Sequence, residues 1–576
     1  MYKYPFPHRQ RALENHQSLN GFWQYKVING ANISSNRFYQ FKQEIKLMDG
    51  LLEVPYSLES KKNQIGRVLQ PDETLLMSLM FDMELVSLDR LFLYFGAVDQ
   101  RCRIWLNEKE VGYHEDGYLP FEVEVTSSIQ KKNNQLVMAI IDESDQGDVP
   151  WGKQKLNHGQ IWYTPQSGIW QSCGLISYPQ EYIRDFYTQY HPQTQQVELF
   201  VDVEDPKAVH VVLYEPTLAG REDEDFLEKS YEPLIETTKK QLTIDQPKLW
   251  SPDQPWLYPM DLYYKNDRVR SYVGLRHVGS KMVDGIRKMS LNDDVVFHTG
   301  VLDQGYWQEG LYTATNQEFI EDLEMVKAMG FNMVRKHIKL EPFRWYFHCD
   351  RLGLFVWQDL VNGGNDYSPL VIQVAGFLNV FLNDANYRLF GRKNRSSRLL
   401  SIIHQDEVIK ALRFFPSIVM WCIFNEGWGQ FDSLAMAKRA RKLDPTRYID
   451  HASGWIDHQG FDFKSVHIYF KPVKLRPSNR LLILSEFGGY SHPVDSHHQE
   501  KIFGYRRYDD LKAYQQGVID LYERQIIPQK HLLSGVCYTQ LSDVEEEVNG
   551  LVTFDREVMK WKVEDFKQIN EKLKTL

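Results

Sequence analysis

Cysteine is scarce in this sequence. Five cysteines occur among 576 residues, and no two of them have the spacing that is typical of thiolate metal sites. We therefore expect neither a disulfide framework nor a Cys-ligated zinc ion. The five are Cys102, Cys173, Cys349, Cys422 and Cys537.

Long hydrophobic runs are lacking as well. The stretch that comes nearest to one, residues 371–382, contains Gln373 and Asn379 and is too short to cross the apolar core of a bilayer. The residues that follow Met1 include no apolar segment like the core of a secretory signal peptide. The sequence therefore favours a cytoplasmic protein with no membrane contact.

An excess of positive charge is also missing. Lys and Arg number 67 and Asp and Glu number 77, which gives a net charge of −10 at pH 7. A mildly acidic chain has no general attraction for nucleic-acid phosphates, so we expect no nucleic-acid partner. The sequence also lacks a phosphate-binding loop, a dinucleotide fingerprint and the G-x-S-x-G motif of serine hydrolases.

The composition that remains is that of a large globular protein. Hydrophobic residues make up 43%, charged residues 25% and aromatic residues 13% of the chain. A length of 576 residues corresponds to about three or four domains of roughly 100–200 residues each. The aromatic content suits the cores of large β domains, and it also suits surfaces that bind the apolar faces of sugar rings.

The first half of the chain has the pattern of β structure. Residues 121–125 alternate strictly between apolar and polar, and residues 197–204 place their apolar side chains on one face. Short runs of this kind, separated by turn residues, are typical of β-sandwich domains. The pattern changes near residue 180 and again between residues 275 and 285, so we expect domain boundaries there.

The second half alternates between helices and short buried strands. A helix is expected to begin at Thr315, because Thr315 and Glu318 have the spacing of a capping box and Gly330 stands where a helix often ends. Eight short apolar runs with helical segments between them are what a (β/α)₈ barrel requires. The runs are residues 295–297, 332–335, 354–357, 418–424, 447–449, 466–469, 481–484 and 535–538.

Two glutamates stand directly behind apolar runs. Glu426 follows the fourth predicted strand and Glu486 follows the seventh, and the carboxyl ends of the strands form the active site of such barrels. These two strands lie on roughly opposite sides of the barrel mouth, so both carboxylates can flank one substrate atom, as glycoside hydrolysis requires. The alternative is that each glutamate only pairs with a nearby arginine or caps a helix.

Further polar and aromatic side chains stand at the same strand ends. They are candidates for binding the substrate, because the carboxyl ends of the barrel strands surround a common pocket. The candidates are Asp303, Arg335, His337, Trp357, Asp359, Asn425, His467, Tyr469 and Gln540.

In their order along the chain, these motifs resemble glycoside hydrolase family 2, which includes β-galactosidases, β-glucuronidases and β-mannosidases. The resemblance implies a multidomain fold with a jelly-roll sugar-binding β-sandwich at residues 1–179, an immunoglobulin-like β-sandwich at 180–278 and a catalytic (β/α)₈ TIM barrel at 279–576. The segments that carry it are residues 54–60, 95–99, 111–121, 152–154, 162–170, 300–310, 335–337, 421–427 and 485–489.

The resemblance also implies the roles of a retaining exo-β-glycosidase. Glu426 is expected to be the general acid/base, which calls for a raised pKa, and Glu486 the nucleophile. Asn425 is expected to hold the 2-hydroxyl of the sugar, Tyr469 to support the nucleophile and Arg335 to keep it ionised. Double displacement places the two carboxyl groups about 5–5.5 Å apart. These steps need no metal and no organic cofactor, so none is expected.

One motif of the family's glucuronidases is not present. Those enzymes carry an Asn-x-Lys motif whose lysine reads the sugar carboxylate, and residues 547–549 of this chain are Glu-Val-Asn. An acid at this place is expected to repel a uronate, which favours a β-galactosidase-like activity on terminal, non-reducing, neutral β-linked sugars. Specificity for β-glucuronides, β-mannosides or α-L-arabinopyranosides remains an alternative. So does a catalytically silent carbohydrate-binding relative.

The expected partner is therefore a small-molecule or oligosaccharide β-glycoside, and the sequence leaves a homo-oligomer open. Residues 335–337 read Arg-Lys-His where some relatives have Arg-x-Ser-His, so the resemblance does not assign a role to His337.

The sequence also predicts where three further sets of residues lie relative to the pocket. Residues 361–401 follow the third strand and are expected to rim the pocket. The histidine-rich residues 491–498 are expected to form an exposed loop near the aglycone rather than a metal site. Each of several tryptophans is expected to pack in a core rather than to stack on sugar; they are Trp151, Trp162, Trp307, Trp428 and Trp455.

Overall fold

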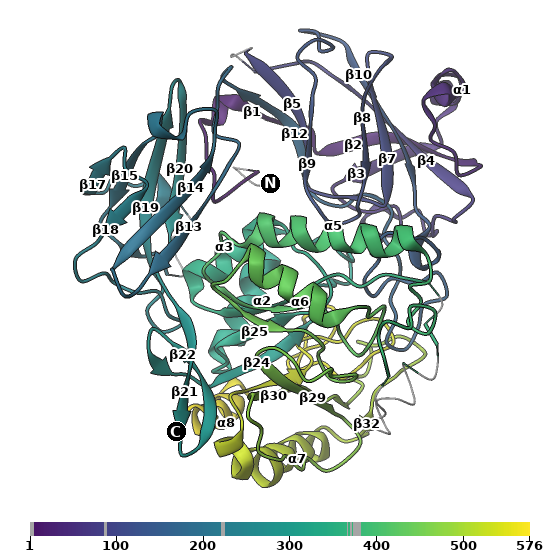
Figure 1. Ribbon diagram of the computed structural model, residues 1–576. Helices are drawn as coiled ribbons and strands as arrows, with labels where there is room; N and C mark the ends of the chain where they lie inside the picture. Colours follow the sequence, from purple (N-terminus) through teal and green to yellow (C-terminus); the bar gives the residue numbers. More distant parts are fainter. Residues whose placement is uncertain are drawn as a thin grey trace.

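The computed structural model describes residues 5–85, 89–220, 225–365, 367–368, 371 and 382–575. Figure 1 shows one β-rich unit at the upper right and another at the upper left, with a barrel below them. The predicted fold class, a jelly-roll sandwich, an immunoglobulin-like sandwich and a TIM barrel, is confirmed. No helix within these ranges is both long enough and apolar enough to cross a membrane.

The first unit is a sandwich of a four-stranded and a six-stranded antiparallel sheet. The two sheets share one core, in which Leu93 and Leu175 of the smaller sheet join Met77 and Ile104 of the larger one. Successive side chains of a strand point to opposite faces, which is why one alternating set is buried. In sheet order the strands are β1 (His16–Ser18), β12 (Cys173–Tyr178), β5 (Arg90–Phe95) and β9 (Phe121–Glu124), and β3 (Gly50–Val54), β2 (Gly21–Asn29), β4 (Glu73–Phe81), β10 (Asn134–Ile141), β7 (Arg101–Leu106) and β8 (Lys109–Glu115).

The second unit is a smaller antiparallel sandwich. Val197 and Leu199 of one sheet lie in the same apolar core as Val211 and Leu262 of the other, and this core continues into the barrel. The strands of the first sheet are β13 (Asp185–His191), β14 (Gln196–Asp202) and β18 (Gln241–Thr243). Those of the second are β16 (Thr217–Leu218), β19 (Trp256–Tyr264), β15 (His210–Tyr214), β17 (Pro233–Thr237) and β20 (Asp267–Val273).

The sheets change at two places along the chain. The first sandwich ends with β12 at Tyr178, and the second sandwich ends with β20 at Val273. The domain limits 1–179, 180–278 and 279–576 stay a prediction.

The barrel begins a few residues later than the sequence pattern predicts. Residues 295–297 were expected to form its first strand, but β23 (Asp294–Val295) pairs with β22 (Ile286–Leu291) in a separate antiparallel sheet. The first barrel strand is β24 (His298–Asp303). The prediction was wrong because His298 and Thr299 are polar, although both are buried.

Eight parallel strands form the barrel sheet. β28 and β29 are the two ends of the sheet order and lie beside each other, so the sheet is nearly closed. The seven later strands that the sequence predicts are confirmed. In sheet order the strands are β28 (Tyr448–Asp450), β27 (Ile418–Cys422), β26 (Phe355–Asp359), β25 (Met333–Lys336), β24, β33 (Gly535–Thr539), β30 (Leu481–Gly488) and β29 (Phe463–Ile468).

Helices follow the strands on the outside of the barrel (Figure 1). The helix predicted to begin at Thr315 is confirmed: Thr315 caps it and forms a capping box with Glu318. Its side chains Phe319, Leu323 and Val326 are buried, as the helical spacing of these residues requires. The helices of the barrel include α2 (Asn316–Ala328), α3 (Phe343–Leu352), α5 (Arg395–Leu412), α6 (Ser433–Leu443), α7 (Leu511–Leu521) and α8 (Val563–Lys574).

A loop of the first sandwich, residues 150–166, reaches over to the barrel. The backbone N–H of Trp151 donates to the carbonyl of Asn362, and the indole of Trp151 donates to the carbonyl of Gly364. The backbone N–H of Thr164 donates to the carboxylate of Glu545. These bonds fix the loop against the residues that follow β26 and β33.

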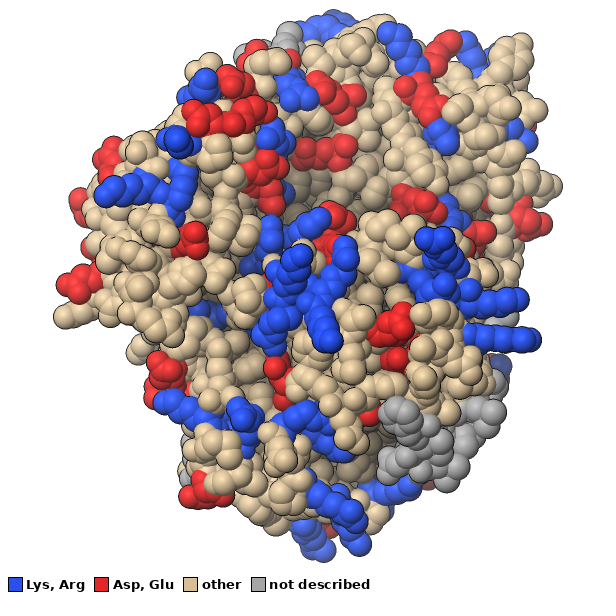
Figure 2. Space-filling view, viewed as in Figure 1, with Lys and Arg blue, Asp and Glu red and all other residues tan. Residues whose placement is uncertain are grey.

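Charges of both signs are interspersed on the face drawn in Figure 2, with a group of Lys and Arg near its middle, where α6 lies in Figure 1. Two arginines of α6 are paired with acids: Arg439 with Asp406 and Arg441 with Asp462. These two arginines therefore belong to local ion pairs on a solvated helix.

Candidate active site

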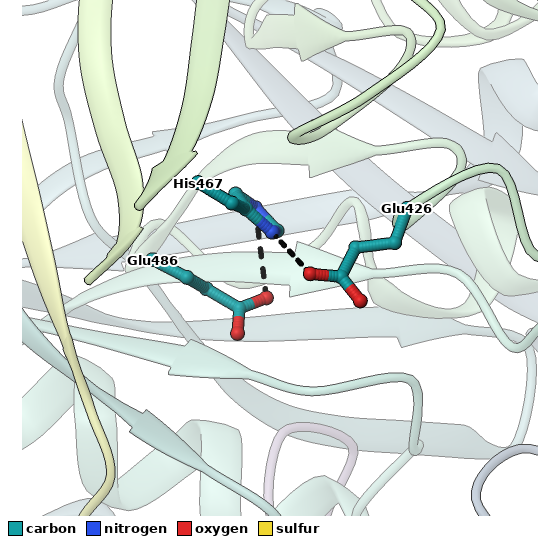
Figure 3. A group of neighbouring side chains, drawn as sticks. All are labelled: Glu426, His467 and Glu486. Carbon is teal, nitrogen blue, oxygen red and sulfur yellow. Dashed lines mark hydrogen bonds and ion pairs between the residues drawn. The ribbon is translucent and has the colours of Figure 1, made fainter. Parts of the chain in front are cut away.

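The two predicted carboxylates meet at the mouth of the barrel. Glu426 follows β27, and Glu486 lies in β30. One carboxylate oxygen of each glutamate and one ring nitrogen of His467 all lie within 4.8 Å of one another. Nδ1 of His467 is 2.7 Å from Oε1 of Glu426, and Nε2 of His467 is 3.6 Å from Oε1 of Glu486 (Figure 3). Both glutamates are buried, so their charges act in an environment with little water.

The backbone at Glu426 has an uncommon conformation. Its φ angle is 49°, in the left-handed region that non-glycine residues seldom adopt. The carbonyl of Ser453 accepts a hydrogen bond of 2.9 Å from the N–H of Glu426 and holds it there. Gly427 follows with a φ of 74°, and a Cβ at this position would lie 2.6 Å from Ile456. The chain thus turns sharply after β27 and directs the carboxylate toward His467.

Arg335 connects the carboxylates behind the site. It is the last residue but one of β25 (Met333–Lys336) and is fully buried. Its guanidinium donates to both oxygens of Asp359 at 2.9 and 3.0 Å, and Nη1 donates to Oε1 of Glu486 at 3.0 Å. Nη2 also donates to Oδ1 of Asn425 at 2.9 Å. One arginine therefore orients Glu486 and Asn425, while Asp359 anchors it from behind.

Tyr469 holds the other oxygen of Glu486. Its hydroxyl donates to Oε2 of Glu486 at 2.6 Å and lies 3.3 Å from Oε1 of Glu426. Burial alone would raise the pKa of Glu486, but the nearby His467, Arg335 and Tyr469 outweigh burial and hold this pKa below its ordinary value. Burial and the two carboxylates raise the pKa of Tyr469 well above its ordinary value. Tyr469 is therefore a proton donor and Glu486 an ionised carboxylate.

A cavity of about 660 Å³ opens in front of this pair. Glu426, His467 and Tyr469 line it together with aromatic rings. The rings are Trp162, Trp428, Trp455, Phe470, Phe503 and Tyr505. A cavity of this size, with aromatic walls and a few convergent polar groups, suits a sugar ring and an attached group.

Three buried polar atoms near the pair have no hydrogen-bond partner among the described residues. They are Nδ2 of Asn425, Nε2 of His337 and Nε1 of Trp428. Nε2 of His337 is 3.8 Å from Oε1 of Glu486. Buried polar groups normally have partners, so these atoms are available for the hydroxyl groups of a ligand.

Lys153 brings a positive charge to the same place. It belongs to the loop of the first sandwich, is 5% exposed, and donates to the carbonyl of Ile161 at 2.9 Å. Its ammonium lies 5.4 Å from the centre of the Trp428 ring. Burial lowers the pKa of Lys153, while the charges of Glu547, Glu486 and Glu426 act in the opposite direction. The ammonium is thus close enough to the carboxylates to influence them.

Several predicted site residues lie one step behind the pair. Asp359 holds Arg335, as described above. Asp303 is paired with Lys336, and Trp357 is fully buried with its indole donating to His298 at 3.0 Å. Asp303 and Trp357 are thus bound by these neighbours, and their contact with the substrate stays a prediction. Lys336 is the middle residue of the Arg-Lys-His sequence. Ion pairs with Asp303 and Glu341 neutralise its buried charge.

Gln540 is part of a buried network rather than of the cavity wall. Its side chain accepts from Gln304 at 2.6 Å and donates to Asn549 at 2.8 Å. Asn549 in turn donates to Glu547 at 2.9 Å. The acid that the sequence places in the Glu-Val-Asn motif is thus 2% exposed and bound by its neighbours.

The expectation that the tryptophans only pack in cores holds for some of them. Trp151 and Trp307 are buried, and neither lines the cavity described above. Trp162, Trp428 and Trp455 do line it, which corrects that expectation for these three.

Some residues near the carboxylate pair were not predicted from the sequence. Lys153, Gln304 and Tyr505 were not among the candidates. Gln304 directly follows Asp303 at the end of β24, so its position was a usable signal. Lys153 and Tyr505 lie on long loops, and no local sequence pattern shows which part of the barrel such loops contact.

Two groups of described residues have the spacing of metal ligands. One is Glu426, His467 and Glu486, whose close contacts are explained by the bonds from Tyr469 and Arg335. The other is His497 with Asp555 and Glu557, where Nδ1 of His497 is 2.7 Å from Asp555. The first group contains both predicted catalytic carboxylates, and the second is a partly exposed hydrogen bond between His497 and Asp555.

The two predicted loops have different outcomes. Much of the loop at residues 361–401 that was expected to rim the pocket lies outside the described residues, namely 366, 369–370 and 372–381. In the histidine-rich segment, His492 is buried beside Tyr514 and His498 is exposed. None of the described residues 491–498 lines the cavity, so the expectation of an aglycone-facing loop has no support.

Family models match nearly the whole chain. The model described as "Glycosyl hydrolases family 2, sugar binding domain" matches residues 17–179, "Glycosyl hydrolases family 2" matches residues 181–276, and "Glycosyl hydrolases family 2, TIM barrel domain" matches residues 288–574.

Curated relatives are similar over part of their length. A β-galactosidase of Halalkalibacterium halodurans is 23% identical over 509 residues, which are 81% of this chain and 46% of the relative. A β-galactosidase of Alteromonas mediterranea is 25% identical over 403 residues, which are 65% of this chain and 34% of the relative. The chain therefore spans less than half the length of these relatives.

Solved structures share the fold along the full chain. A β-glucuronidase of an uncultured Clostridium species has a TM-score of 0.74 at 18% identity and covers 98% of both chains. A β-glucuronidase of Ruminococcus gnavus has a TM-score of 0.75 at 18% identity and covers 99% of this chain and 98% of its own. At this identity the similarity concerns the fold.

Proposed function

The chain belongs to glycosyl hydrolase family 2, and we propose that it is a retaining exo-β-glycosidase acting on a terminal, non-reducing, neutral β-linked sugar. The observation that carries the proposal is the buried carboxylate pair, Glu426 and Glu486, of which Glu426 lines the cavity of about 660 Å³. An oxygen of one lies within 4.8 Å of an oxygen of the other. Retaining enzymes have carboxyl groups about 5–5.5 Å apart, whereas inverting enzymes leave about 6.5–9.5 Å for a water molecule.

In the first step Glu486 is the nucleophile. An oxygen of its carboxylate forms a bond to the anomeric carbon, and the bond from this carbon to the leaving oxygen breaks. The leaving oxygen takes the proton of Glu426. Arg335 and Tyr469 keep Glu486 ionised for the attack, because both donate hydrogen bonds to its charged form.

In the second step water releases the sugar. Glu426 lost its proton in the first step and is now a carboxylate. The esterified Glu486 is no longer charged, so it does not oppose the negative charge of Glu426, which can act as a base. Glu426 takes a proton from water, the water oxygen bonds to the anomeric carbon, and the ester bond to Glu486 breaks. Two inversions at the same carbon retain its configuration.

The neighbouring free polar atoms fit the hydroxyl groups of a sugar. Asn425 presents Nδ2, since Arg335 already occupies its Oδ1. We assign Asn425 to the 2-hydroxyl, and His337 and Trp428 to further hydroxyls. A site that is built to hydrogen-bond hydroxyl groups discriminates strongly against analogues that lack them.

A neutral sugar is favoured over a uronate by Glu547. This buried acid lies close enough to Lys153 for their charges to interact, and so it offsets the positive charge that a uronate would need. The curated relatives are β-galactosidases, and a β-galactoside is the neutral substrate that we propose first.

β-Glucuronidase activity is the second candidate, and Lys153 is the observation that favours it. A buried ammonium whose one hydrogen bond among the described residues goes to Ile161 has donors to spare for a sugar carboxylate. β-Mannosidase and α-L-arabinopyranosidase activities are further alternatives. A small-molecule or oligosaccharide glycoside and a cytoplasmic location remain part of the proposal.

A panel of 4-nitrophenyl glycosides tests the proposal. We expect turnover of the β-galactoside above the β-glucuronide, β-mannoside and α-L-arabinopyranoside, and a loss of about 10³-fold or more in Glu486→Gln. Azide is expected to restore activity to Glu426→Ala and to give a β-glycosyl azide. An α-glycosyl azide would mean that the two roles are exchanged. If the wild type turns over no glycoside of the panel, a silent carbohydrate-binding relative is the better description. If it is active and neither variant differs from it, Glu426 and Glu486 are not the catalytic pair.

A further inference from the structure

A chain of buried amide groups connects His337 with Glu547. Gln304 follows β24, Gln540 follows β33, and Asn549 lies on the loop after β33. Nδ1 of His337 is 2.8 Å from Oε1 of Gln304. The next contacts run from Gln304 to Gln540 at 2.6 Å, from Gln540 to Asn549 at 2.8 Å and from Asn549 to Glu547 at 2.9 Å.

Every member of this chain is removed from water. The exposed fractions are 2% for His337, 4% for Gln304, 0% for Gln540, 0% for Asn549 and 2% for Glu547. Water is therefore not available to satisfy an amide that points the wrong way, and a mismatched buried pair is costly. The amide NH₂ groups must therefore all donate in the same direction along the chain of hydrogen bonds.

Glu547 sets this direction, because a carboxylate accepts hydrogen bonds and donates none. Asn549 has to turn its NH₂ group toward Glu547, which leaves its oxygen to accept from Gln540. Gln540 then offers its oxygen to the NH₂ group of Gln304. The oxygen of Gln304 is left for His337, so Nδ1 of His337 has to carry the proton.

The other nitrogen of His337 faces the site as a consequence. Burial and the charges of Lys153, Arg335 and His467 lower the pKa of His337 well below its ordinary value, so the ring is neutral. A neutral ring with its proton on Nδ1 has a free electron pair on Nε2. This atom has no hydrogen-bond partner among the described residues and lies 3.8 Å from Oε1 of Glu486 and 3.9 Å from Oδ2 of Asp359, beyond hydrogen-bond distance of both.

We propose that Glu547 is a positioning residue, which acts through Asn549, Gln540 and Gln304 to fix His337 in the tautomer whose Nε2 accepts a hydrogen bond from a hydroxyl of the bound sugar. The inference rests on the proposed function, since it names what one side chain of that site recognises. It gives the acid of the Glu-Val-Asn motif a role in reading a neutral hydroxyl group.

A purely structural role for Glu547 is the competing explanation. The hydroxyl of Tyr163, from the loop of the first sandwich, donates to Oε2 of Glu547. Glu547 could thus serve only to hold the loop on the barrel. The variant Tyr163→Phe separates the two roles, because it removes this bond and leaves the chain from Asn549 to His337 intact.

The kinetic experiment uses the full-length protein with 4-nitrophenyl β-D-galactopyranoside and its 2-, 3-, 4- and 6-deoxy derivatives. In the wild type, the ratio of kcat/KM between the parent and one deoxy derivative reports the hydroxyl that His337 binds. We expect Glu547→Leu to lower this one ratio by about 10-fold, as the loss of one directed hydrogen bond does. Glu547→Gln is the conservative control, since its amide oxygen can still accept from Asn549, and it is expected to keep the ratio. Tyr163→Phe is expected to keep it as well.

The tautomer itself is a readout that does not depend on turnover. In ¹⁵N-histidine-labelled protein, with the signal of His337 assigned by its loss in His337→Gln, we expect the Nδ1–H form in the wild type and a mixture in Glu547→Leu. An Nε2–H form in the wild type would overturn the inference, as would equal losses on all five substrates in Glu547→Leu. If the wild type turns over no galactoside but its His337 has the Nδ1–H form, the proposed substrate fails while the chain of hydrogen bonds stands.

Discussion

The hydroxyl of Tyr469 lies 2.6 Å from Oε2 of Glu486 and donates a hydrogen bond to this oxygen. Arg335 donates to the other oxygen of the same carboxylate at 3.0 Å. Both oxygens of Glu486 are thus bound by donors while the carboxylate is buried. Donors on both sides favour the ionised form, which is the form that attacks an anomeric carbon.

The Tyr469–Glu486 bond predicts a shift in the pH profile. Tyr469→Phe removes one of the donors that lower the pKa of Glu486, so this pKa should rise. Glu486 is active when ionised, and the acidic limb of kcat/KM should therefore move to higher pH, with about a 10-fold to 10²-fold loss of kcat. Tyr187→Phe is the control, because Tyr187 lies on β13 and stacks on Phe200 far from the site. An unchanged acidic limb in Tyr469→Phe would contradict the role of Tyr469.

The buried position of Arg335 predicts a large loss of stability when it is replaced. Arg335→Met leaves Asp359 and Glu486 buried without their cation, and breaking such a pair costs about 3–5 kcal/mol. Arg439→Met breaks an ion pair on α6 in which Arg439 is half exposed, and it should cost less than about 1 kcal/mol. Chemical denaturation of both variants checks this. Equal stability of the two would show that Arg335 is not the cation that holds the site together.

Glu59 in the first sandwich predicts that stability falls at alkaline pH. Burial raises the pKa of Glu59 to about 8, from an ordinary value of 4.5. The folded protein therefore holds a proton that the unfolded chain releases, and this contribution is complete below about pH 4.5 and is lost as the pH rises through about 8. Tm should fall between pH 6 and pH 9, and it should fall less in Glu59→Gln. The control is Glu53→Gln on β3, which should follow the wild type.

Lys153 predicts that the first sandwich takes part in substrate binding. Lys153→Met should lower kcat/KM for the preferred glycoside by about 10-fold, because the ammonium next to the cavity is lost. If Lys153 reads a sugar carboxylate, the loss should be confined to the β-glucuronide and should be larger there. Lys155→Met, on the same loop, is the matched control, since Lys155 lies 4.1 Å from the centre of the Trp162 ring. Equal activities of the two variants on every glycoside would exclude a role for Lys153.

Much of the barrel could be predicted from the sequence, because its strands are short apolar runs and their last residues are polar. Glu426 and Glu486 were found in this way, and the structure brings them together with Asn425, Arg335 and His467. The first strand was misplaced because β24 begins with the polar residues His298 and Thr299. Burial of those two side chains depends on neighbours that are distant in the sequence.

The side chains from other parts of the chain could not be predicted in the same way. Trp357 lies in β26 as Arg335 lies in β25, but its indole donates to His298 rather than to the carboxylate pair. Lys153 lies beside Trp428 of the cavity wall only because bonds such as those of Trp151 hold its loop on the barrel. The positions of strand ends can therefore be predicted from a sequence. The direction in which a side chain points, and the place where a long loop contacts the barrel, depend on tertiary contacts.

The most direct test of the central claim is to trap the covalent intermediate. A 2-deoxy-2-fluoro-β-galactoside with a good leaving group slows the second step more than the first, so a glycosyl enzyme should accumulate. Mass spectrometry of peptides from the inactivated protein should find the sugar on Glu486, with none on Glu426. A sugar on Glu426, or a first product of the α configuration from an unmodified β-glycoside, would contradict the assignment of Glu486 as the nucleophile.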